Sequence, residues 1–165
     1  MANRKLAIYA AIVASYTVIS LLLGSLSFGM VQFRAAEVLL VLCLYDMRFI
    51  VPVSIGCLVT NFIGIINGLN PLVLDLLIGT LATLISGFCV YGCRNIRWFN
   101  LPILSLSLPV IINGVLVGLE LCFYFPLSPL MLMIYVGLGE FVSVTILGLL
   151  LYKPIGKAIK QYIEV

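Results

Sequence analysis

The chain has 165 residues, of which 64% are hydrophobic and 9% are charged, and its formal net charge is +3. Soluble domains are about half apolar and about one quarter charged, so a water-soluble protein of this length could not bury so much apolar surface. The composition therefore excludes an ordinary soluble domain and predicts an all-α, polytopic membrane protein whose main solvent is lipid.

The first expected helix runs over residues 5–24. Arg4 and Lys5 precede an apolar run that is long enough to span a bilayer, and no convincing small-residue cleavage site follows it. We therefore expect a membrane helix here rather than a signal peptide. Small residues recur on it at helical spacing: Ala7, Ala10, Ala11, Ala14 and Ser15. Such rows let a second helix approach closely in lipid, so they predict either packing inside the bundle or contact with a partner protein.

A polar group follows between two strongly apolar segments, and it consists of Gln32, Arg34 and Glu37. Two opposite charges lie three residues apart at the start of an apolar run, which is unusual in a chain with so few charges. We interpret these residues as the rim of a small-molecule pocket. The alternative is an internal ion pair of Arg34, with Glu37 or another acid, that fixes helix packing.

The stretch over residues 36–66 is apolar apart from Asp46 and Arg48, so it fits either one long kinked helix or two helices joined by a tight turn. Positive residues cluster in three other places: Arg4 with Lys5, Arg94 with Arg97, and Lys153 with Lys157 and Lys160. With two helices, all three clusters lie on the same side as the Asp46–Arg48 turn, as the positive-inside rule requires. We therefore expect six spans with both termini in the cytoplasm. The first of the two helices would be short, with about 12 residues or roughly 18 Å.

The six expected spans lie near residues 5–24, 36–47, 49–66, 72–93, 101–122 and 130–152. No linker rich in serine, glycine or charge separates them, so we expect a single membrane domain over residues 1–165. Residues 67–71 carry a turn signal between the third and fourth spans. Ser128 and Pro129 are typical of the cap and the first residue of a helix, here the sixth span.

Further polar residues lie in the outer half and the centre of the expected bundle. Asn61, Asp75 and Glu120 fall near outer helix ends, whereas Asn113 and Glu140 fall near the middle of the bilayer. Asn113 and Glu120 are seven residues apart, so they share one helix face and lie about 10 Å apart along its axis. An ionised carboxylate at the centre of a membrane helix costs about 2.5–3.5 kcal/mol. We therefore expect these acids to be matched by a cation, by protonation or by a cationic ligand.

No catalytic grouping is visible in the sequence. It has no histidine, no G-x-S-x-G elbow and no Walker A phosphate loop. Cys89 and Cys93 are one helical turn apart, but two thiols without a further ligand make a poor zinc site, so packed free thiols are expected. We expect no enzyme activity, no cofactor, no metal and no nucleic-acid partner, and ATP could be used only through other subunits.

Five short segments occur in order along nearly the whole chain and together carry a resemblance. They are Gln32-Phe33-Arg34 with Glu37, Gly56-Cys57 with Asn61, residues 75–84, residues 113–121 and residues 135–140. In this combination the chain resembles the queuosine-precursor transporter (QueT) family, whose members are substrate-binding S components of energy-coupling factor (ECF) transporters.

The resemblance implies a six-helix protein of the bacterial plasma membrane that binds a 7-deazaguanine, such as preQ1 or preQ0, on the external face. Uptake would be driven by ATP through a shared module of a transmembrane coupling protein and two ATPase subunits. In that family type, small residues of the first helix contact the coupling protein. This favours the partner interpretation of Ala7, Ala10, Ala11 and Ala14.

The polar residues suit such a ligand. The edge of a guanine-like ring carries N–H donors, which a carboxylate can accept. It also carries a carbonyl, to which an amide or a guanidinium can donate. We expect Glu140 and Asn113 on the deeper part of the ligand, Glu120 or Asp75 at its other end, and a closing loop above it. The full expected substrate-binding set comprises Gln32, Arg34, Glu37, Asn61, Asp75, Asn113, Glu120 and Glu140, with Gln32 and Arg34 in that loop.

Other functions fit the same residues. The nearest is an S component for a different vitamin or nucleobase, because pocket chemistry alone does not identify the ring. A stand-alone secondary carrier with Glu140 as its protonatable coupling group is a second possibility. A third is a membrane scaffold whose polar groups only lock its helices together.

Overall fold

The computed structural model describes residues 2–163, and the side chains of Ala2, Ser25 and residues 160–163 lie outside this description. The described part of the chain consists of helices joined by loops, and it contains no β-strand, only an isolated bridge between Trp98 and Leu101. In chain order the elements are α1 (Ala2–Leu23), α2 (Ser25–Phe28), η1 (Ala35–Leu44), η2 (Met47–Phe49), α3 (Ile50–Ile66), η3 (Val73–Leu76), α4 (Ile78–Gly92), α5 (Ile103–Leu121), α6 (Pro129–Glu140), η4 (Phe141–Ile146) and α7 (Leu147–Ile163). The all-α class is therefore confirmed.

Among the residues that the structure describes, five helical segments are long and apolar enough to cross a membrane: Asn3–Leu23, Met47–Ile66, Val73–Gly92, Ile103–Leu121 and Pro129–Ile159. The chain is thus a multi-pass membrane protein. The remaining expected span, the second in chain order over residues 36–47, is η1, a 3-10 helix of ten residues. At a rise of about 2 Å per residue it is roughly 20 Å long, less than the roughly 30 Å hydrocarbon core. Six full crossings and cytoplasmic termini stay predictions.

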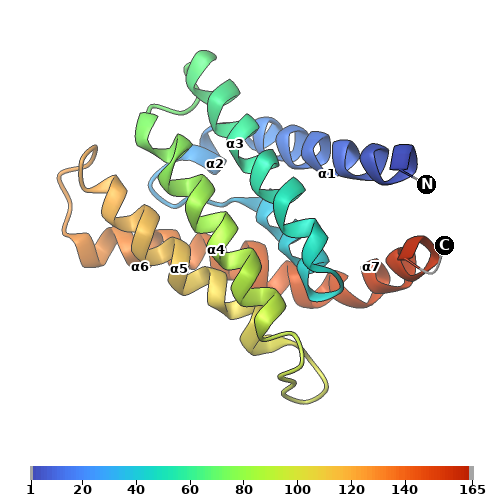
Figure 1. Cartoon of the computed structure of the whole chain (residues 1–165). Helices are drawn as coiled ribbons and strands as arrows, with labels where there is room; N and C mark the ends of the chain where they lie inside the picture. Colours follow the sequence, from blue (N-terminus) through green and yellow to red (C-terminus); the bar gives the residue numbers. More distant parts are fainter. Residues whose placement is uncertain (1, 164–165) are drawn as a thin grey trace.

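The chain breaks between η1 and α3, as the two-helix interpretation predicts. Asp46 has an extended backbone there, and its side chain accepts a hydrogen bond from the backbone N–H of Arg48 at 2.8 Å. Figure 1 shows this turn, the two described chain ends and the loop after α4 toward one side of the molecule. The α3–α4 and α5–α6 loops lie toward the other side (Figure 1). This arrangement agrees with the charge pattern of the sequence.

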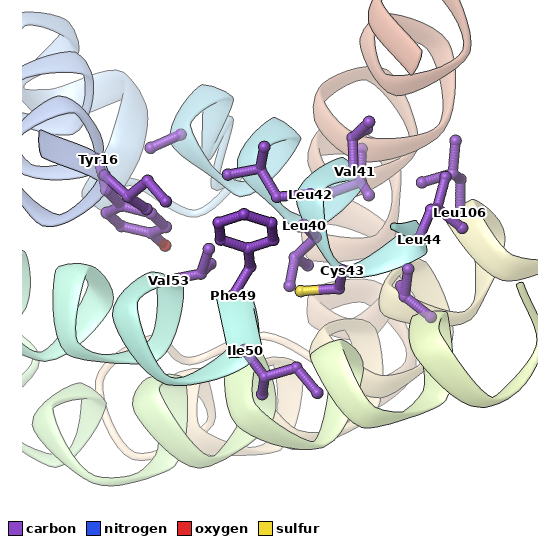
Figure 2. Packing of buried hydrophobic residues seen from close by; sticks show 14 of the residues in the cluster. Tyr16, Leu40, Val41, Leu42, Cys43, Leu44, Phe49, Ile50, Val53 and Leu106 are labelled. Atoms are coloured by element: carbon purple, nitrogen blue, oxygen red, sulfur yellow. The ribbon is translucent and has the colours of Figure 1, made fainter. Parts of the chain in front are cut away.

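The bundle packs around η1. Leu40, Val41 and Cys43 of this helix have no exposed surface, and η1 contacts α1, α3, α4, α5, α7, η2 and η4. Figure 2 shows its side chains enclosed by Tyr16 of α1, by residues from the start of α3 and by other apolar side chains. Apart from Glu37, η1 is apolar on all its faces, and a helix of this kind can be buried on every side in a bundle.

The last expected span is longer and less regular than the sequence predicts. It begins as expected, because Pro129 opens α6 and the Ser128 hydroxyl accepts a hydrogen bond from the backbone N–H of Met131 at 3.4 Å. After Glu140 it widens into the π-helical segment η4 and then continues as α7. The cysteines are free thiols, as expected.

A glycine sets how closely α5 and α6 pack. A Cβ on Gly118 would lie 2.6 Å from the Cα and 2.8 Å from the backbone nitrogen of Met133. We expect Gly118→Ala to force the helices apart and to lower the unfolding free energy by about 1–3 kcal/mol, measured as a lower melting temperature in detergent. In Gly92→Ala the new Cβ meets nothing within 4 Å, so this variant should keep wild-type stability. An equal loss in both variants would contradict the close-packing explanation.

Candidate functional site

The polar residues that the sequence predicts for substrate binding are buried in one connected cluster. They come from six parts of the chain: the loop before η1, η1 itself, α3, η3, α5 and α6. Their exposed fractions are 0% for Gln32, Glu37, Asp75, Asn113 and Glu140, 1% for Glu120, 2% for Asn61 and 5% for Arg34. Charged and amide side chains are seldom buried without a partner or a function, so the cluster is the candidate site. We call it the polar cluster.

Arg34 and Asp75 form the ion pair of the cluster. The Arg34 Nη2 donates to both carboxylate oxygens of Asp75, at 2.5 and 2.6 Å. The side-chain amide of Asn70 donates to Asp75 Oδ2 at 3.2 Å, and that of Asn61 donates to the Asp75 backbone carbonyl at 2.7 Å. Gly79 leaves room for this pair, because a Cβ there would lie 2.0 Å from Asp75 Oδ1.

The Arg34–Glu37 ion pair considered from the sequence is not formed. Arg34 precedes η1 with a non-helical backbone and contacts η3, whereas Glu37 lies in the first turn of η1. The Glu37 Oε1 instead accepts hydrogen bonds from the Tyr16 hydroxyl at 2.6 Å and from the Thr83 hydroxyl at 2.5 Å. Glu37 therefore ties η1 to α1 and to α4.

Many polar atoms of the cluster have no hydrogen-bond partner within the described part of the chain. They are both side-chain polar atoms of Gln32 and of Asn113, both carboxylate oxygens of Glu120 and of Glu140, Nη1 of Arg34 and Oε2 of Glu37. A buried polar group without a partner costs about 1–3 kcal/mol. So many buried polar atoms without partners destabilise the fold. This pattern is expected where a bound ligand supplies the missing hydrogen-bond partners.

The unpartnered groups favour a ligand rich in N–H donors. The single arginine of the cluster is already bound to Asp75, which leaves three carboxyl groups, on Glu37, Glu120 and Glu140, without a cation of their own. Carboxylates accept hydrogen bonds and attract positive charge, while an amide can both donate and accept. The site therefore suits a ligand with several N–H groups, a carbonyl for an amide, and a positive charge.

Glu140 and Glu120 both interact electrostatically with the Arg34–Asp75 ion pair. Glu140 lies beside Asn113 and interacts electrostatically with Glu37 as well as with the ion pair. Glu120 interacts electrostatically with Asp75 and Arg34.

The loop before η1 lies directly on α6 next to Glu140. A Cβ on Gly139 would be 2.3 Å from the backbone carbonyl oxygen of Gln32, so only a glycine permits this approach. The π-helical segment η4 begins at the next residue after Glu140, and π-helical turns occur frequently at functional sites. The Gln32 side chain carried by this loop is fully buried.

Tyr16 and Thr83 join the cluster without having been predicted as site residues. Thr83 lies four residues after Gly79 on α4, so helical spacing could have indicated it. Tyr16 lies in an apolar helix, and only the packing of α1 against η1 and α3 shows that its hydroxyl reaches Glu37. A Cβ on Gly56 of α3 would lie 2.7 Å from Tyr16 Cβ, so this glycine allows the approach.

Comparisons with known proteins agree with the resemblance. The family described as QueT transporter matches residues 6–157 of the chain. Over 72 residues the chain is 32% identical to a protein of Lactococcus lactis subsp. cremoris (strain MG1363) named queuosine precursor transporter QueT. That alignment covers 39% of this chain and 43% of the relative, less than half of its length. No solved structure is detectably similar.

Proposed function

The chain belongs to the QueT transporter family, and from this premise we propose that it is the substrate-specificity (S) component of an ECF-type importer. Its substrate is a queuosine precursor, a 7-deazaguanine such as preQ1 or preQ0, bound in the polar cluster from the external face of the bacterial plasma membrane. The observation that carries the proposal is the concentration of buried, unpartnered carboxyl and amide groups on Gln32, Asn113, Glu120 and Glu140.

The chemistry of a 7-deazaguanine matches these groups. Its pyrimidine edge offers N–H and NH₂ donors for a carboxylate and a carbonyl for an amide, roles that we assign to Glu140 and Asn113. An aminomethyl substituent is cationic and would be held by a carboxylate at the other end. The sequence leaves Glu120 and Asp75 open for that role. Asp75 is already bound to Arg34 and Asn70, which favours Glu120.

Ligand binding to the purified wild-type protein tests the substrate. At a concentration of preQ1 one hundred times its Kd, we expect stabilisation by about 2.7 kcal/mol, measured as a higher melting temperature in detergent and confirmed by calorimetric titration. Guanine, thiamine and riboflavin serve as comparison ligands. Stabilisation by a vitamin alone would favour an S component with another substrate, and no stabilisation by any ring compound would favour the membrane scaffold.

The exposed face of α1 supports the ECF assignment. Ala7, Ala10, Ala11 and Ala14 are all exposed, so this row is not used for packing inside the bundle. In lipid such a row offers a close-packing surface for a helix of another protein, which we assign to the transmembrane coupling protein. The two ATPase subunits would then act through that protein.

Uptake experiments separate the importer from a stand-alone carrier. In cells that contain the coupling protein and its ATPases, Ala11→Leu should abolish accumulation of labelled preQ1, because the bulky side chain blocks helix approach, while binding by the purified variant stays at the wild-type level. Accumulation by the wild-type chain in cells without these subunits would instead support a stand-alone carrier.

A further inference from the structure

The loop that joins α4 to α5 exposes three large apolar side chains. Over residues 93–102 the exposed fractions are 44% for Ile96, 60% for Trp98 and 93% for Phe99. The loop connects two segments that are long and apolar enough to cross a membrane, and Figure 1 shows it projecting from the bundle below the ends of these helices. Apolar side chains that are grouped on a surface indicate contact with a membrane or with a protein, so this loop is a candidate contact surface.

Hydrogen bonds and a tight turn fix the tip of this loop. Trp98 and Leu101 exchange two backbone hydrogen bonds, at 3.0 and 2.9 Å, and the two residues between them have positive φ angles, 51° for Phe99 and 61° for Asn100. Two positive φ angles are typical of a type I′ turn, in which asparagine is common. A phenylalanine is unfavourable there, because its Cβ lies close to the following carbonyl oxygen. The Tyr152 hydroxyl of α7 donates to the Asn100 carbonyl at 3.3 Å, so the turn is also attached to the last helix.

Two arginines lie in the same loop. Residues 93–102 contain Arg94 and Arg97 and no acid. The Arg94 guanidinium donates to the Tyr91 carbonyl at 2.8 Å and lies 3.8 Å from the centroid of the Tyr91 ring. That of Arg97 lies 5.9 Å from the centroid of the Tyr152 ring. All these partners are uncharged, and neither arginine forms an ion pair with a residue that the structure describes. The apolar tip is therefore accompanied by positive charge.

We propose that the Trp98–Phe99 tip is a membrane anchor, which inserts among the headgroups of an anionic leaflet with Arg94 and Arg97 beside the lipid phosphates. Two observations favour a lipid surface as the occupant: the short connection of the tip to two membrane segments and the charge of the loop. An indole ring combines a large apolar surface with a polar N–H and is enriched at the membrane interface. By the predicted topology the loop faces the cytoplasmic leaflet, whose anionic lipids attract basic residues close to the membrane.

This anchor sets how α4 and α5 lie in the membrane. The tilt and rotation of membrane helices depend on interfacial aromatic and basic side chains as well as on packing. Thr83 of α4 and Asn113 and Glu120 of α5 belong to the polar cluster, so the anchor acts on two helices that form that site. The proposal itself depends on neither the deazaguanine substrate nor the ECF assignment.

The fluorescence of Trp98 tests the proposal, because this residue is the only tryptophan of the chain. The purified full chain is reconstituted into vesicles of phosphatidylcholine and phosphatidylglycerol in equal parts. One of the two lipids carries bromine, either near the glycerol end or near the methyl end of its acyl chains. We expect bromine near the glycerol end to quench Trp98 more strongly than bromine near the methyl end. Brominated phosphatidylglycerol should quench more strongly than brominated phosphatidylcholine.

Three variants test the parts of the anchor. Phe99→Ser should weaken quenching by brominated lipid, increase quenching by acrylamide from the water phase and shift the emission to longer wavelength. Phe123→Ser is the matched control, because it removes a phenylalanine that is 78% exposed from the α5–α6 loop, and it should leave Trp98 emission unchanged. Arg94→Gln combined with Arg97→Gln should abolish the preference for brominated phosphatidylglycerol. Gel filtration and circular dichroism confirm that each variant is monodisperse and helical.

Three results would overturn the anchor. One is a wild-type Trp98 that acrylamide quenches as strongly as a free tryptophan derivative and that brominated lipid does not quench. Another is an equal change of Trp98 emission in Phe99→Ser and Phe123→Ser. The third is a loss of quenching by brominated lipid when a coupling protein and its ATPases are added, which would assign the tip to a protein interface.

Discussion

Replacing Arg34 by methionine is expected to lower the unfolding free energy by about 3–5 kcal/mol, because the change leaves Asp75 as a buried carboxylate without its cation. Arg34 is 5% exposed and Asp75 is fully buried, and the guanidinium contacts both carboxylate oxygens. The amides of Asn61 and Asn70 remain near Asp75, but they do not replace a positive charge. Unfolding in detergent, followed by circular dichroism, measures the loss.

Two further variants make this experiment decisive. The double variant Arg34→Met with Asp75→Leu removes both charges and should recover most of the stability, because a buried ion pair can often be replaced by apolar residues at little cost. Arg48→Met breaks an ion pair whose arginine side chain is half exposed, and surface pairs contribute little, so this variant should stay close to wild type. If Arg34→Met were no more harmful than Arg48→Met, the structural role of the buried pair would be wrong.

Glu140→Gln is expected to weaken preQ1 binding by about ten- to one-hundredfold, since a hydrogen bond to a charged group contributes about 1.5–3 kcal/mol. The same change should leave the empty protein as stable as wild type or more stable. The reason is that the two carboxylate oxygens of Glu140 are buried without a partner in the described structure. Opposite effects on affinity and on stability distinguish a ligand-binding group from one that only supports the fold. Calorimetric titration and thermal unfolding of the same preparation measure both.

Two further variants test which side chains of the cluster contribute to binding. Glu120→Gln should weaken preQ1, which carries the cationic aminomethyl group, more than preQ0, which lacks that cation. Ser86→Ala removes another buried hydroxyl without a partner, from a position not assigned to the ligand, and should leave both affinities unchanged. Unchanged affinity in both Glu140→Gln and Glu120→Gln would remove these residues from the proposed site.

Much of the fold follows from local patterns in the sequence. Long apolar runs require backbone hydrogen bonds to be made within a helix when the surroundings are lipid, so the helical class is determined by composition. The break at Asp46 and the start of α6 at Ser128 and Pro129 follow from short-range chemistry, because an acceptor side chain beside a free backbone N–H favours a cap. The short-range patterns do not reveal that residues 35–44 form a buried 3-10 helix at the centre of the bundle.

The polar residues of the site were also identifiable from the sequence, because a charge or amide in an apolar run is conspicuous. The residues with which they form hydrogen bonds could not be identified from the sequence. Glu37 is three residues from Arg34, yet Arg34 binds Asp75, which is 41 residues away, and Glu37 binds Tyr16 and Thr83 from two other helices.

The sequence by itself determined the membrane class, the helical segments and the identity of the buried polar side chains, since each depends on nearby residues and on transfer from water to lipid. The tertiary structure alone decided which of those side chains meet and how the absence of a side chain at Gly139 lets the loop carrying Gln32 lie against α6. The physical reason is that helical periodicity specifies which face of a helix is polar. The rotation and approach of one helix against another depend on close packing between residues far apart in the chain.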